Sequence, residues 1–248
     1  MNTRRTTTRT PTRRHKPTSY EATGPNQVWS WDITYMRNKA TGEFMYGYVI
    51  IDIYSRYIIH AEVHERDCAE LAQEFLAKAF RKYGIQPRRL VLHSDNGASM
   101  KAKEILALLE NWGVEFSHSR PRVSNDNPYS ESLFRTLKHT GRGYPKKGFK
   151  SILAARVWLE GFVKIYNHNN YHSGINWVTP ASRFKGEDAA VLAARKAVLE
   201  AARAKNPRRW INGRVRDCTP APSQFLNPDK PNLNFARASS ILTKRLFL

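Results

Sequence analysis

The chain has 248 residues, which is long enough to bury one hydrophobic core and to carry an additional module. It contains 41 Lys and Arg residues against 21 Asp and Glu residues, a formal net charge of +20 at pH 7. Such an excess indicates a polyanionic partner, usually nucleic acid or an acidic membrane surface. A basic solvated surface or a ribosome-associated protein would show the same balance, so charge alone leaves these alternatives open.

The sequence excludes a membrane span and a disulfide framework. Its most apolar stretch, residues 48–59, is interrupted by Asp52 and Arg56 and is too short to cross a bilayer. No apolar segment follows the basic N-terminus, so that segment is not a secretory signal. The two cysteines, Cys68 and Cys218, form no Cys-X-X-Cys pair. We therefore expect a reducing, cytoplasmic location and no structural zinc site.

The first half of the chain begins with a basic arm and continues into strands. Residues 1–17 contain six Arg or Lys residues, repeated Thr and no acid, which predicts a disordered arm. Three segments rich in Ile, Val and Tyr then predict an antiparallel meander, at residues 27–36, 45–55 and 56–64. Trp29 and Trp31 fall on one face of the first strand by period two, which indicates core packing.

Helix and strand patterns alternate after residue 64. Asp67 is in position to cap the first helix, which Gly84 ends. Asn127 and Pro128 fit the cap and first position of a third helix, whose core face holds Leu133, Phe134 and Leu137. The expected helices cover residues 71–84, 103–113, 127–138, 151–166 and 187–205, and the further strands cover residues 88–95 and 114–119. This order predicts an α/β fold with a mixed five-stranded sheet and flanking helices.

The Ala-rich helix at residues 187–205 has a weakly apolar face. We interpret it as packing on the chain's own core, with binding of a partner protein as the alternative. The residues after it are Pro-rich and basic. The expected organisation is thus a basic arm at residues 1–17, a core at residues 18–185 and an extension at residues 186–248.

Three acidic residues occupy positions that suit a metal site. Asp32 lies in the middle of the first strand, Asp95 lies at the carboxyl end of the fourth, and Glu131 lies one turn into a helix. Strand ends in open α/β sheets are where sites are usually built. Hard cations such as Mg²⁺ prefer oxygen ligands, and two ions roughly 3.5–4 Å apart stabilise phosphodiester cleavage. Without metal, three clustered carboxylates would repel one another and resist ionisation.

The motifs around these acids resemble a known family. HSDNG (residues 93–97) and DNPYSESLFRTLK (residues 126–138) place 35 residues between the second and third acid. WSWDIT (residues 29–34) and YNHNNYHSGINWVTPA (residues 166–181) match further blocks. The pattern is similar to the Asp-Asp-35-Glu signature of retroviral integrases and their closest bacterial insertion-sequence transposases, over residues 25–181 and more weakly to 231. One position departs from it, because the family commonly has Arg where this chain has Asn170.

The resemblance implies a ribonuclease H-like fold and metal-dependent cleavage and strand transfer of DNA. Carried over by position, Asp32, Asp95 and Glu131 are the catalytic, metal-binding triad, with two Mg²⁺ or Mn²⁺ ions. The implied partners are double-stranded DNA, at element ends and target, and further copies of the chain, which would be DNA-associated in the cytoplasm. The alternatives are a catalytically inactive DNA-binding transposase remnant and a nuclease without joining activity.

Basic residues near the triad predict contacts to the DNA backbone. Residues 119–150 hold eight Arg or Lys residues against two acids. We expect Arg120, Arg122, Arg135 and Lys138 to bind DNA, and Lys138 lies two helical turns from Glu131, about 10 Å along the axis. A surface ion pair between Arg135 and Glu131 is the simpler alternative.

Three further polar residues near these motifs have structural interpretations. We interpret Asp126 as a turn or capping acid and Asp52 as paired locally, for example with Arg56. His93 fits either a proton shuttle or a neutral, hydrogen-bonded strand histidine.

The segment before Asp32 predicts that this chain alone binds DNA with little preference for its base sequence. The resembling transposases usually recognise element ends through an upstream helix-turn-helix, which 31 basic, Thr-rich residues do not supply. We expect specificity to come from a helix-turn-helix partner polypeptide or a longer fused product, with Arg208, Arg209 and Trp210 as the other candidate readers. Competition between labelled element-end duplex and random duplex of equal length checks this. A hundredfold preference, about 2.7 kcal/mol, would contradict the expectation.

Overall fold

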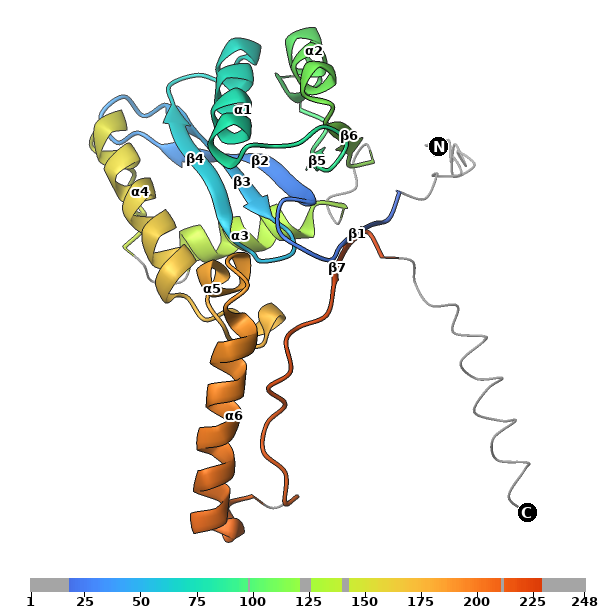
Figure 1. The fold of residues 1–248 in the computed structure, drawn as a ribbon. Coiled ribbons are helices and arrows are strands. Elements are labelled where there is room, and N and C mark those ends of the chain that lie inside the picture. Colours follow the sequence, from blue (N-terminus) through green and yellow to red (C-terminus); the bar gives the residue numbers. More distant parts are fainter. Residues whose placement is uncertain (1–17, 98, 121–125, 140–142, 211, 229–248) are drawn as a thin grey trace, which may run out of the picture.

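A mixed five-stranded sheet forms the centre of the protein, in the strand order β4-β3-β2-β5-β6 (Figure 1). The computed structural model describes residues 18–97, 99–120, 126–139, 143–210 and 212–228. The strands are β2 (Val28–Arg37), β3 (Phe44–Asp52), β4 (Ile58–His64), β5 (Val91–Ser94) and β6 (Glu115–His118). β2, β3 and β4 are antiparallel, whereas β5 runs parallel to β2, and β6 runs parallel to β5. The predicted α/β class and five-stranded mixed sheet are confirmed. The predicted arm at residues 1–17 lies outside the described residues.

Helices cover both faces of the sheet and follow its two apolar side-chain layers (Figure 1). α1 (Ala69–Tyr83) and α2 (Lys103–Trp112) pack on one face, where Trp29 and Trp31 are fully buried. α3 (Pro128–His139) and α4 (Ile152–Asn169) pack on the other face, against residues such as Met36. Because side chains alternate along a strand, the odd residues of β2 face α1, and its even residues face α3. The predicted core role of these tryptophans is confirmed.

The helix ends agree with the sequence in part. α1 ends at Gly84, whose φ of 56° is left-handed and whose N–H bonds the carbonyls of the last turn, as predicted. The predicted cap by Asp67 is wrong, because Cys68 occupies the N-cap position without a side-chain bond. The Asp67 carboxylate instead accepts hydrogen bonds from Tyr48 Oη at 2.7 Å and Ser99 Oγ at 3.0 Å. These long-range partners outcompete the local cap.

The C-terminal extension projects from the core and then returns to it (Figure 1). After α5 (Pro180–Phe184), α6 (Asp188–Lys205) extends outward, and within it only Asp188 and Leu192 are buried. The interpretation that this helix packs on the main core is wrong, because it has too few apolar side chains on one face. Its base shares a small separate cluster, formed by Ile175, Val178, Leu192, Cys218 and Ala221. No helix in the described ranges is long and apolar enough to span a membrane.

A buried arginine ties this extension to the core. Arg183 donates to the carbonyl of Tyr54 at 2.9 Å, to the Asp188 carboxylate at 3.1 Å and to the carbonyl of Ala221 at 2.9 Å. The short strand β7 (Gln224–Leu226) then pairs antiparallel with β1 (Tyr20–Ala22). These contacts cross the predicted boundary between residues 185 and 186, and that boundary stays a prediction.

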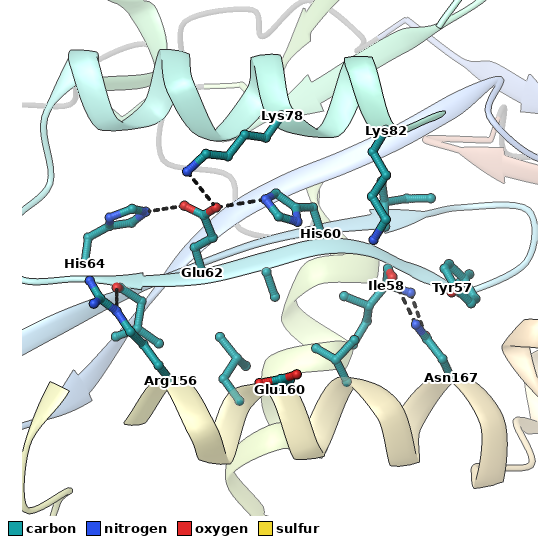
Figure 2. Close-up of a pocket in the computed structure, with 15 residues that line it drawn as sticks. Tyr57, Ile58, His60, Glu62, His64, Lys78, Lys82, Arg156, Glu160 and Asn167 are labelled. Carbon is teal, nitrogen blue, oxygen red and sulfur yellow. Dashed lines mark hydrogen bonds and ion pairs between the residues drawn. The ribbon is translucent and has the colours of Figure 1, made fainter. Parts of the chain in front are cut away.

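The edge strand β4 borders a groove of about 670 Å³ between α1 and α4 (Figure 2). The side-chain amide of Asn167 accepts from the Ile58 N–H at 2.8 Å and donates to the Ile58 carbonyl at 3.0 Å. Arg156 Nε donates to the Val63 carbonyl at 3.0 Å. An edge strand exposes unpaired backbone groups, so these two side chains from α4 satisfy part of that edge. Asn167 belongs to the sequence block at residues 166–181, which the sequence alone did not explain.

We expect Asn167→Ala to lower the free energy of unfolding by about 2–3 kcal/mol, since it leaves two buried backbone groups of Ile58 without partners. Urea denaturation measures the change. Asn169→Ala removes an exposed amide from the same helix and should change stability by less than about 0.5 kcal/mol. Equal effects of the two substitutions would contradict the role of the Asn167 amide.

Candidate active site

The parallel pairing of β2 with β5 brings two of the predicted acids together. Trp31 on β2 is the register partner of Ser94 on β5. Asp32 and Asp95 each follow these partners by one residue, so they lie next to each other where β5 ends. Asp32 has an even number on β2 and therefore faces the α3 side of the sheet. Its Oδ1 accepts a hydrogen bond from the Ile33 N–H at 2.8 Å.

A buried serine fixes α3, and with it Glu131, against β2. Ser30 precedes Asp32 by two residues on the same face of the strand. Its Oγ donates to Asn127 Oδ1 at 2.5 Å and lies 2.6 Å from Ser130 Oγ. A hydroxyl has one hydrogen, so Ser130 is the donor in the second bond. Because Glu131 follows Ser130 in the first turn of α3, this network sets the position of the third acid relative to the first.

Asn127 and Pro128 begin α3 where the sequence predicted. Leu133 and Leu137 are buried, and Phe134 is partly buried against the same cluster. The side-chain oxygen of Asn127, however, accepts from Ser30 on the sheet. The sequence showed the helix start but not this partner, because Ser30 lies 97 residues away.

Asp95 is held by residues at the end of β6. Ser119 Oγ donates to Asp95 Oδ1 at 2.7 Å. His93 Nε2 lies 3.3 Å from the same Oγ, and its Nδ1 lies 3.0 Å from Ser117 Oγ. Since the Ser119 hydrogen is used on Asp95, His93 donates through Nε2 and accepts through Nδ1. Burial lowers the pKa of His93 to about 4, so the ring is neutral at pH 7 and fits a hydrogen-bonded strand histidine better than a proton shuttle.

Burial and neighbouring carboxylates raise the pKa of two of these acids, Asp32 and Glu131. Burial, with further contributions from the charges of Asp95 and Glu131, raises the pKa of Asp32 to about 7. Burial and the Asp95 charge also raise the pKa of Glu131. The Lys138 ammonium acts in the opposite direction on Asp32. Burial lowers the pKa of the half-buried Lys138 amine, and the charge of Asp32 acts to raise it.

The chemistry of the three acids fits a hard divalent cation, because all three supply anionic oxygen donors. As the side chains stand, no group of three His, Cys, Asp or Glu residues among the described ranges converges on one point. Two of the carboxylates are turned to other partners, Asp32 to the Ile33 N–H and Asp95 to Ser119. Neighbouring carboxylates repel one another, which opposes closer approach of their charged oxygens.

The predicted DNA-binding residues have different environments. Arg135 is exposed. Arg135 and Glu131 both lie in the described part of α3, and no ion pair joins them there. Arg120 donates through Nε and Nη2 to the buried Asp126 carboxylate, each at 2.9 Å, and its backbone N–H bonds the same group. The pair braces the chain before α3, so Asp126 is a turn acid as predicted, and Arg120 has a structural role that the sequence did not reveal. Arg122 lies outside the described residues. DNA contact by all four basic residues stays a prediction.

Asp52, the rival acid on β3, has different local partners from the one proposed. Its carboxylate accepts from Ser55 N–H at 2.8 Å, Ser55 Oγ at 2.5 Å and Asn26 N–H at 2.9 Å. The Arg56 side chain instead bonds Gln224 and lies over the Tyr129 ring. Asp52 therefore stabilises the turn between β3 and β4, and local pairing is confirmed. Hydrogen bonds to the carboxylate come from Ser55 and Asn26, and the charge of Arg56 also attracts it and acts to lower its pKa.

Comparison with protein families identifies the domain that contains this site. Two models, both described as integrase core domain, match residues 22–124 and 112–180. Together they span all three acids and the five-stranded sheet. The chain belongs to the integrase core domain family. Within this integrase core, β2, the end of β5 and α3 carry Asp32, Asp95 and Glu131, the residues that the sequence motifs predicted as a triad.

Relatives of this integrase core include insertion-sequence proteins. The chain is 30% identical to the insertion element IS600 uncharacterized 31 kDa protein of Shigella sonnei, over 66% of this chain and 59% of that protein. It is 29% identical to the transposase for insertion sequence element IS904 of Lactococcus lactis, over 65% of this chain and 62% of that protein. It is 34% identical to transposase InsF for insertion sequence IS3A of Escherichia coli, over 48% and 40%. The chain thus spans less than two thirds of the length of these relatives.

A solved structure supports the fold of the integrase core. A chain from the simian T-cell lymphotropic virus intasome in complex with PP2A regulatory subunit B56 gamma superposes with a TM-score of 0.52 and 17% identity. The match covers 68% of this chain and 58% of that chain. The likeness confirms the ribonuclease H-like arrangement that the sequence predicted.

We expect Asp32→Asn to stabilise the metal-free protein in a pH-dependent manner. The pKa of Asp32 is about 7 in the folded state and about 3.9 when unfolded. Ionised Asp32 therefore costs the native protein stability as pH rises from about 4 through about 7, and the cost is constant above that. Below pH 4 both states are protonated and the variants should match. At pH 8 the amide should raise the free energy of unfolding by on the order of 1–3 kcal/mol.

Denaturation in EDTA between pH 4 and 8.5 measures the difference. Glu43→Gln, which neutralises an exposed acid in the turn between β2 and β3, serves as the control. If the free energy of unfolding of wild type and Asp32→Asn changed with pH in parallel, ionisation of Asp32 would not destabilise the native protein.

Proposed function

We propose that this integrase core catalyses metal-dependent cleavage and strand transfer of DNA through Asp32, Asp95 and Glu131, as a transposase. The observation that carries the proposal is the pairing of β2 with β5, which sets Asp32 beside Asp95. The charges of Asp95 and Glu131 add to burial in raising the pKa of Asp32. Acids that repel one another without a counterion are stabilised by a divalent cation. The insertion-sequence relatives support the same reaction class.

The three carboxylates would hold two Mg²⁺ or Mn²⁺ ions. Such ions activate the attacking oxygen and neutralise charge on the leaving oxygen during in-line displacement at phosphorus. The chain's own contribution is positioning, since Ser30 holds the start of α3 against β2 and Ser119 orients Asp95. Lys138 adds positive charge beside Asp32, where a scissile phosphate would lie.

The proposed substrate is double-stranded DNA, at the ends of an element and at the target, and copies of the chain would assemble on it. Exposed Arg135 and half-buried Lys138 lie on the face of α3 that carries Glu131, one and two turns away. Contacts from such side chains to phosphates position the duplex without reading its sequence. A helix-turn-helix partner polypeptide, or a longer product, would supply recognition of the element ends.

Each of Asp32→Asn, Asp95→Asn and Glu131→Gln should lower Mg²⁺-dependent cleavage of element-end DNA by at least about a thousandfold, near 4 kcal/mol of transition-state stabilisation. Strand transfer of labelled, precleaved ends should fall in parallel. Glu110→Gln, which changes an exposed acid of α2, is the matched control and should retain activity. Thermal midpoints without metal should hold or rise, because each triad variant removes repulsion.

The outcomes separate the alternatives. Any triad variant with wild-type cutting would remove that residue from the ligand set. Cleavage without joining of precleaved ends would identify a nuclease. DNA binding by the wild type without cleavage in Mg²⁺ or Mn²⁺ would identify an inactive remnant.

A further inference from the structure

The segment that projects from the core is an ordered arm rather than a loose tail. We define the C-terminal arm as residues 188–210 and 212–217, which comprise α6 and most of the segment that returns beside it (Figure 1). An 18-residue helix extends about 27 Å. Arg203 Nη1 donates to the Gly213 carbonyl at 2.7 Å and so joins the helix to the returning segment.

At its base the arm is fixed to the α4–α5 connection. Arg195 donates to the carbonyls of Asn176 at 2.9 Å and Trp177 at 2.7 Å. The Arg216 guanidinium lies 5.3 Å from the centre of the Trp177 ring. These contacts hold the arm in a defined direction relative to the core.

The tip of the arm concentrates uncompensated positive charge. Residues 203–216 hold six Arg or Lys residues and no acid. Two of these have partners, since Arg203 pairs with Glu200 inside the arm at 2.6 Å and Arg216 lies on Trp177 of the α4–α5 connection. The other four are exposed, and none has an acidic partner within ion-pair distance in the described part of the chain: Lys205, Arg208, Arg209 and Arg214.

This tip fits a polyanion better than a protein surface. Protein interfaces are centred on apolar and aromatic side chains, with charged residues depleted at the centre. At the tip the one large ring is Trp210, which is partly buried and has the Arg209 guanidinium 5.8 Å from its centre. Duplex DNA presents one negative charge per about 1.7 Å of axis, so a cluster of free guanidinium groups gains several phosphate contacts at once.

We infer that the tip of the C-terminal arm is a second DNA-binding surface, separate from the carboxylate site, which grips the phosphate backbone of duplex DNA. The inference rests on the proposed function, since DNA is the polyanion that a transposase handles. The length of α6, about 27 Å, equals that of about eight base pairs of duplex at about 3.4 Å each. A duplex that reaches both the carboxylates and the tip is then held at two places along its length. The contact is to phosphates and adds no base recognition by itself.

The test compares two full-length variants that each lose four positive charges. The tip variant is Lys205→Gln, Arg208→Gln, Arg209→Gln and Arg214→Gln. The control variant carries Arg81→Gln, Lys82→Gln, Arg89→Gln and Lys103→Gln, at exposed positions on α1, α2 and the turn before β5. Fluorescence anisotropy in EDTA gives the dissociation constant of a 30-base-pair duplex over a salt series. Each phosphate contact contributes about 0.9 to the slope of log affinity against log salt.

We expect the tip variant to bind at least tenfold more weakly at 0.1 M salt, with a slope smaller by about 2 to 4. The control should change affinity less than threefold and slope by less than 1. A charge-preserving variant, with Lys205→Arg and the three arginines changed to Lys, should bind like wild type and shows that the arm still folds. Equal effects of the tip and control variants would overturn the inference. So would a tip variant that alters only the oligomeric state, which would assign the tip to a protein contact.

Binding in EDTA needs no catalysis, so this result is independent of the triad. Failure of the triad variants to lose cleavage would leave a tip-dependent salt slope intact. Conversely, the tip variant could keep the wild-type salt slope while the triad variants lose cleavage. That result would overturn the inference about the tip and retain the proposed function.

Discussion

The candidate site depends on the mixed pairing of β2. This strand is antiparallel to β3 on one side and parallel to β5 on the other, which brings the carboxyl end of β5 level with its middle. Asp32 and Asp95 thus become neighbours although 62 residues separate them in the chain. Two ionised carboxylates that are partly buried and close to each other are energetically unfavourable. The backbone hydrogen bonds of β2 to β3 and β5 nevertheless hold both residues in these positions.

Polar side chains around the carboxylates hold this arrangement in place through hydrogen bonds. Ser30 connects β2 to the start of α3, Ser119 connects the end of β6 to Asp95, and the Arg120–Asp126 pair holds the chain that enters α3. Ser119 bonds one of the acids directly, and Ser30 bonds Ser130, the residue before Glu131. Such supporting hydrogen bonds fix acids that gain nothing by themselves from approaching one another.

Periodicity sufficed to predict the sheet and the helices of the core, whereas the three acids indicated by motif spacing stay a prediction. Alternation in β2 and the apolar face of α3 are local properties, so they survive folding unchanged. The rest required knowledge of distant partners. Asp67 lost its predicted capping role to Tyr48 and Ser99, and Ser30 looked unremarkable until α3 was placed beside it. The pairing of β1 with β7 joins segments about 200 residues apart, too short for any pattern to show.

The amide of Asn167 has a consequence for how molecules of this protein meet. The Asn167 amide bonds both backbone groups of Ile58 and so occupies the place of a neighbouring strand. An open sheet edge is a template for strand addition and leads to fibrous aggregation when many copies are crowded together. With α4 bonded to β4 at Ile58 and Val63, part of this edge is closed to a sixth strand. Strand addition here would first have to displace the Asn167 amide, which protects the edge when copies are crowded together.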